Sequence, residues 1–199
     1  MAQLSDVTRK IARDLMSRSA KRMDGAAAAI AREDITEGEF DNHFDGVVSA
    51  IFHIADAVEL VRTGVHRRAG EGEEATVIRS VVATLTTDKV GSVPAPARLI
   101  DLNGRRNTSI HGHWTEILDR DALANAIVAG REFHRAARVY LERRGVALDA
   151  CLPAPLRPLP DHRRGAGPAV ESPQGGQPCE RPSKARTSTS PIATATTQS

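Results

Sequence analysis

Aromatic residues are scarce in this sequence. Phe, Trp and Tyr together make up 3% of the 199 residues, although hydrophobic residues as a whole make up 40%. A core must therefore be built mainly from Ala, Val, Ile and Leu. Sandwiches and barrels are enriched in aromatic and β-branched residues, so this composition favours packed helices. The length indicates one domain with room for an additional segment.

Cysteines and long apolar runs are also few. The two cysteines, Cys151 and Cys179, lie in a Pro- and Gly-rich region, and two such thiols form neither a disulfide framework nor a metal site. The first ten residues lack the apolar segment of a secretory signal. No uninterrupted apolar run approaches the ~20 residues that span a bilayer. We therefore expect a cytoplasmic protein that does not engage a membrane.

Charge of one sign does not dominate the chain. Residues 1–150 contain 21 Lys and Arg against 22 Asp and Glu, and residues 151–199 contain 6 against 3. A domain of near-neutral charge can contact nucleic acid only through a local patch. Nine of the eleven prolines follow residue 150. We expect residues 1–150 to form a helical domain and residues 151–199 a disordered tail, because such a tail buries too little apolar surface to offset its ordering entropy.

Apolar residues recur at helical spacing through most of residues 5–145. The first helix is expected over about residues 5–32. The second opens with a capping box, Thr36 followed by Glu39, and ends at Gly64. A shorter helix is expected over about residues 73–88, with a strand as the alternative for residues 81–87 because several residues there are β-branched.

Two further segments complete the predicted fold. After Pro94 and Pro96, which mark a loop and a new helix start, residues from 97 onward carry a polar motif described below. The last helix begins at Asp119 or Asp121 and ends at Gly145. The sequence thus predicts an all-α fold, a four- to five-helix up-and-down bundle.

One segment has a chemically suggestive composition: Arg106-Asn107-Thr108-Ser109-Ile110-His111. In a helix, Asn107 and His111 are four residues apart and share a face, and the long Arg106 side chain can reach the same side. A guanidinium can bind a phosphodiester while an imidazole transfers a proton. RNA supplies its own nucleophile, the 2′-hydroxyl, so this chemistry needs no metal. Judged by spacing alone, a hydrogen-bonding or surface group near a helix end is the favoured interpretation.

The segment resembles the Arg-Asn-x-x-x-His motif of HEPN domains, small helical bundles of prokaryotic toxin and defence systems. Residues 44–57 resemble the second helix of that family, residues 133–141 resemble its closing helix, and the likeness covers roughly residues 5–145. The resemblance implies a metal-independent endoribonuclease that acts on RNA as a homodimer, with no cofactor. It implies Arg106 as the phosphate-binding group, His111 as the general acid or base, and Asn107 as the residue that orients both.

Neighbouring residues extend this candidate site. Arg105 and His113 are candidates for substrate binding, although a solvated Arg105 is an alternative. One branch of the family has a Tyr two residues after the His, which an antitoxin nucleotidyltransferase modifies; His113 stands there in this chain, which puts regulation by such a partner in doubt. No Cys or carboxylate cluster completes a metal site around these histidines. His53 and Asp56 could support the site from the second helix, or could form a polar helix flank.

The sequence is also consistent with a second function besides RNA cleavage. A non-catalytic helical module that binds a nucleotide, RNA or a partner protein fits the near-neutral charge of residues 1–150. A bundle unrelated to HEPN domains, with the motif a coincidence, is the third interpretation. RNA cleavage separates the first interpretation from the other two.

Overall fold

The computed structural model describes residues 4–65, 73–110 and 119–148, which form five helices. These are α1 (Asp6–Ile30), α2 (Glu37–Thr63), α3 (Glu74–Thr87), α4 (Pro96–Ile110) and α5 (Arg120–Arg143). No strand occurs in these three ranges, which confirms the predicted all-α fold. The strand alternative for residues 81–87 is wrong: Ile78, Val81, Val82 and Leu85 of α3 are all buried, at the spacing of one helix face.

Local sequence signals fix where the helices begin and end. The Ser5 side chain accepts a hydrogen bond from the Thr8 amide at the start of α1. The predicted capping box of Thr36 and Glu39 is present in both directions at the start of α2. Gly64 ends α2 in the left-handed region, at φ 73°, a conformation that glycine adopts without steric cost. These signals confirm the predicted boundaries of α2.

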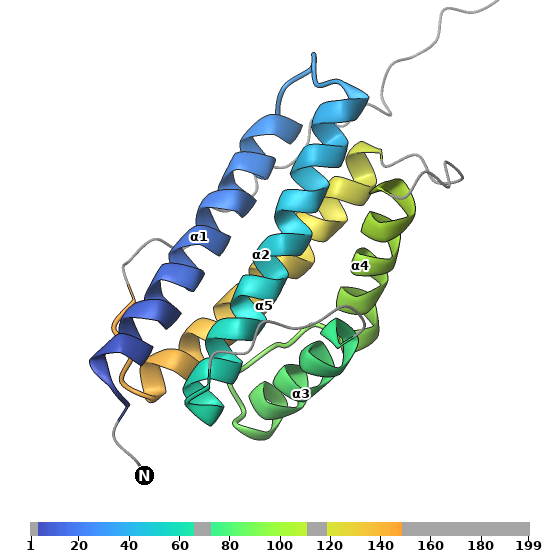
Figure 1. Ribbon diagram of the computed structural model, residues 1–199. Helices are drawn as coiled ribbons and strands as arrows, with labels where there is room; N and C mark the ends of the chain where they lie inside the picture. The colour runs from blue at the N-terminus through green and yellow to red at the C-terminus, as the bar shows by residue number, and fades with distance from the viewer. Residues whose placement is uncertain (1–3, 66–72, 111–118, 149–199) are drawn as a thin grey trace, which may run out of the picture. The chain divides into compact units, whose positions relative to one another are not determined.

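The three long helices pack together, and α2 lies at the centre of the arrangement. It contacts each of the other four helices. Figure 1 shows α2 between α1 and α4, with α5 behind it and α3 beside the lower part of α4. The chain reverses between α1 and α2, so these two helices run antiparallel. One strip of α2 therefore remains at the surface between α1 and α4.

The core lies where α1, α2 and α5 meet. Its largest fully buried side chains include Phe44, Phe133 and Ile51, each of which stabilises the fold by about 1.5–3 kcal/mol through burial. Gly130 of α5 lets the helices approach closely, because a Cβ there would stand 3.0 Å from Met23 Sδ of α1 and 3.6 Å from Val47 of α2. Small residues therefore compensate for the scarcity of aromatics.

Some sequence predictions fall on residues outside the described ranges. These include His111, His113 and the predicted disordered tail over residues 151–199. In the described part of the chain, no helix is long and apolar enough to cross a membrane.

Candidate functional site

Arg106 is the residue of the predicted motif that the structure places most clearly. It lies on α4, and its Nε–H donates a hydrogen bond to a carboxylate oxygen of Asp45 on α2. The Arg106 side chain is 27% exposed and that of Asp45 is 39% exposed. The guanidinium is thus held across two helices but still reaches solvent.

The sequence of α4 explains why Arg106 faces α2. Pro96 is the first residue of the helix, a position where its missing N–H costs nothing. Leu99 and Leu102 are buried, at 2% and 7% exposure, and seat the helix on the bundle. Arg106 follows them by seven and four residues, so it lies on the same side of α4. Its long side chain extends from that buried row to Asp45.

The two neighbours of Arg106 point elsewhere. Arg105 forms an ion pair with Asp101 one turn earlier on α4, with 2.9 Å between Nε and Oδ2. This is a solvated pair within one helix, so a phosphate contact by Arg105 stays a prediction. Asn107 is exposed. His111 and His113 lie outside the described residues, so their approach to Arg106 also stays a prediction.

Asp45 belongs to an exposed strip of α2. Asp45, Ser49 and His53 follow one another at four-residue spacing and are all partly exposed, which places them on one face. We call this face the outer strip of α2. Arg106 reaches the strip from α4, while Arg18 and Arg22 of α1 act electrostatically on His53 at its other end. Sequence analysis identified neither Asp45 nor the two α1 arginines.

His53 is neutral near pH 7. Partial burial lowers the pKa of its imidazole first, and the positive charges of Arg22 and Arg18 lower it further. Its Nδ1 atom is buried and has no hydrogen-bond partner within the described ranges. His53, which sequence analysis proposed as a support for the motif, is thus influenced by the arginines of α1.

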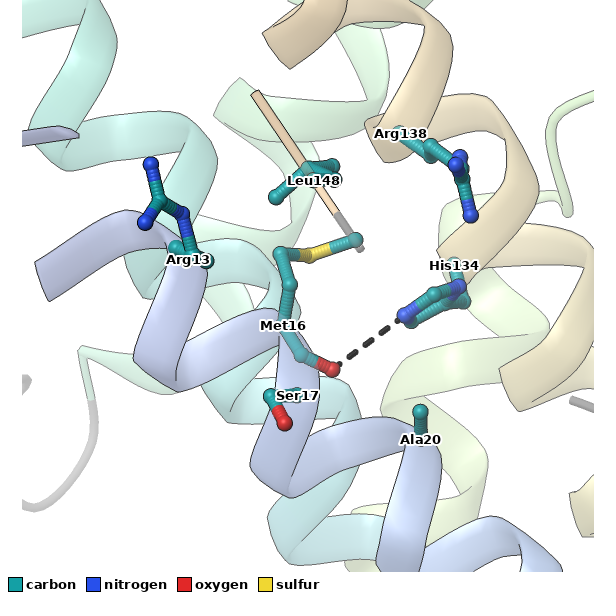
Figure 2. A pocket seen from close by; sticks show the side chains of 7 residues that line it. All are labelled: Arg13, Met16, Ser17, Ala20, His134, Arg138 and Leu148. Carbon is teal, nitrogen blue, oxygen red and sulfur yellow. Dashed lines mark hydrogen bonds between the residues drawn. The ribbon is translucent and has the colours of Figure 1, made fainter. Parts of the chain in front are cut away.

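A separate polar group lies in the α1–α5 interface. His134 is 3% exposed, and its Nε2 lies 3.3 Å from the Met16 carbonyl oxygen. Figure 2 shows this contact beside a small cavity, which is lined by Arg13, Met16, Ser17, Ala20, His134, Arg138 and Leu148. The cavity volume is about 20 Å³, enough for one water molecule. It is a packing feature that cannot hold a nucleotide.

No cluster of three or more His, Cys, Asp or Glu side chains is placed to hold a metal among the described residues. Comparison of the chain with known protein families, curated proteins and solved structures finds no match.

Proposed function

We propose that this protein is a metal-independent endoribonuclease of the toxin or defence type, with Arg106, Asn107 and His111 in its active site. The observation that carries the proposal is the Arg106–Asp45 pair. A carboxylate that holds one N–H of a guanidinium fixes its plane and leaves the other donors for a phosphate. The resemblance to HEPN domains supports the proposal, because residues 106–110 of the motif lie on α4, the penultimate of the described helices.

The proposed reaction needs only these side chains and the RNA. His111 accepts the proton of a 2′-hydroxyl as its oxygen attacks the adjacent phosphorus. The bond from phosphorus to the 5′-oxygen breaks, and that oxygen takes up a proton, which leaves a 2′,3′-cyclic phosphate and a 5′-hydroxyl. Arg106 binds the non-bridging oxygens, where negative charge develops. In a homodimer, a second copy of His111 would deliver the proton to the leaving oxygen.

The test is cleavage of single-stranded RNA by substituted full-length chains. His111→Ala should lower the rate by about 10² to 10⁴, the usual contribution of an acid–base group. Arg106→Ala should cause a similar loss, and Arg106→Lys should restore little, because an ammonium lacks the planar fork. Arg79→Ala is the matched control: Arg79 is exposed on α3, and its removal should leave the rate unchanged.

Two additions test the metal and the dimer. EDTA should not change the rate. A mixture of His111→Ala and Arg106→Ala chains should recover activity if each site draws on both subunits. Cleavage that survives both substitutions, or that requires a divalent ion, would contradict the proposed mechanism.

Binding without cleavage is the second candidate function. It fits the near-neutral charge of residues 1–150, and it does not need His111 to transfer a proton. RNA that binds tightly to the unsubstituted chain but is never cut would support this function over the nuclease.

A further inference from the structure

Most arginines in the described ranges hold a carboxylate or a backbone carbonyl oxygen. Arg18, Arg22, Arg79 and Arg135 have no such partner among the described residues, and all four are exposed. Arg79 and Arg135 are the unpartnered arginines of α3 and α5, one on each helix. Arg18 and Arg22 are one turn apart on α1, so their charges reinforce each other.

Two like charges one turn apart destabilise a helix slightly, and no ion pair within the described ranges offsets this cost. Asp14 lies one turn before Arg18 but forms no ion pair with it in the described structure, and Lys21 adds a third positive charge between the two arginines. The charge of the pair therefore remains available to an external anion.

The position of this pair connects it to the candidate active site. Arg18 and Arg22 are on α1, which packs against α2, and their charges act on His53 at one end of the outer strip of α2, while Arg106 meets Asp45 at the other end. Eight residues of helix separate His53 from Asp45, which corresponds to ~12 Å. A stacked strand carries one phosphate per ~3.4 Å. The strip therefore spans about three to four nucleotides between the two cationic ends.

We propose that Arg18 and Arg22 bind the phosphate backbone of a single RNA strand that lies along the outer strip of α2, from His53 to the Arg106–Asp45 pair. This inference rests on the proposed ribonuclease function and names where that enzyme holds its substrate. Each guanidinium presents two parallel N–H donors to a phosphate. His53, uncharged near neutral pH, adds a hydrogen-bonding group rather than a third cation beside the strand.

The test is RNA binding, measured by fluorescence polarisation with a labelled twelve-nucleotide single strand. Full-length chains carrying His111→Ala are used, so that cleavage does not consume the probe. Arg18→Gln with Arg22→Gln should raise Kd about tenfold at low salt. The matched control is Arg79→Gln with Arg135→Gln, which removes the same charge from exposed, unpartnered positions. It should change Kd less than twofold.

The salt dependence gives a second readout. Each phosphate contact to a single strand contributes about 0.7 to the slope of log K against log salt concentration. The Arg18/Arg22 double variant should lose about 1.4 of that slope, and the control should keep it. Equal losses in both double variants, or unchanged binding in the first, would overturn the inference.

The outcomes also separate this inference from the proposed function. A chain that binds no RNA at any salt concentration contradicts both. RNA binding that is unchanged by the Arg18 and Arg22 substitutions overturns only the proposed contact with the RNA backbone. If RNA binding depends on Arg18 and Arg22 but the unsubstituted chain never cleaves RNA, the backbone contact is supported and the proposed nuclease function is overturned.

Discussion

Two arginines make the same kind of contact in opposite surroundings. Arg131 of α5 reaches Asp24 of α1, and Arg106 of α4 reaches Asp45 of α2. The Arg131 side chain is only 4% exposed, and its Nε and Nη1 atoms are buried without a partner among the described residues. Among the described residues, Arg106 has no buried polar atom that lacks a hydrogen-bond partner. A buried guanidinium acts within the fold, whereas one at the surface has donors left for a ligand.

The comparison separates a structural region from a functional one. The α1–α5 interface buries its polar groups in a packed core, so changes there should act on stability. The Arg106–Asp45 pair at the outer strip of α2 remains partly exposed to water, so under the proposed function changes there should act on RNA. The following experiments test that division, beginning with the largest expected effect.

Removal of the carboxylate partner should distinguish the two ion pairs most strongly. Asp24→Asn leaves the buried charge of Arg131 without compensation and should lower the free energy of unfolding by about 3 kcal/mol, the low end for buried pairs because Asp24 is half exposed. Asp45→Asn breaks a solvated pair and should lower it by less than about 1 kcal/mol. Urea denaturation measures both values.

The same two variants should rank in reverse order in RNA cleavage. Asp45→Asn frees Arg106 to leave its position and should slow cleavage about tenfold, since misplacement of a binding group raises the barrier. Asp24→Asn should leave the rate of the folded protein unchanged. Equal stability losses in the two variants would contradict the distinction between the pairs.

Added volume should also affect the two regions differently. Gly130→Val places side-chain atoms against Met23 and Val47, and such overpacking should lower the free energy of unfolding by about 1–3 kcal/mol. Gly46 on α2 has nothing within 4 Å of an added Cβ. Gly46→Ala should therefore stabilise the protein by up to ~1 kcal/mol through helix propensity alone. A Gly130→Val chain as stable as the parent would show that the core adapts without strain.

Mild acid should destabilise the protein through its buried imidazole. Burial holds the pKa of His134 below its ordinary value, although the hydrogen bond to the Met16 carbonyl partly opposes this. The unfolded chain takes up a proton near pH 6.5, while the folded chain takes it up only at a lower pH. The free energy of unfolding should therefore fall as pH decreases from 7 towards 5, by at most ~1.4 kcal/mol per pH unit for one histidine.

His134→Gln should flatten this pH dependence in denaturation curves recorded between pH 5 and 7. His53, whose pKa is also lowered but whose side chain is partly exposed, provides the comparison: His53→Gln should flatten it less. A stability profile that is unchanged in the His134→Gln chain would mean that other groups govern acid sensitivity.

The sequence by itself determined the helices and their ends. The Thr36–Glu39 capping box and the Gly64 stop of α2 were readable, and Asp119 was one of two candidates for the cap of α5, because each depends on groups within four residues of one another. The periodic apolar residues of α3 identified its buried face for the same reason. The Arg106–Asn107 segment stood out as a candidate site because its residues are adjacent in the chain.

Only the tertiary structure decided what those residues meet. Arg106 and Asp45 are 61 positions apart, and Arg131 and Asp24 are 107 apart. Each contact depends on which helices are neighbours and how each is rotated about its axis. The outer strip of α2 arises in the same way, because its residues stay partly exposed after α1 and α4 pack against α2. A helical period identifies a buried face, but helix packing determines which partner covers it and which polar edge remains open to a ligand.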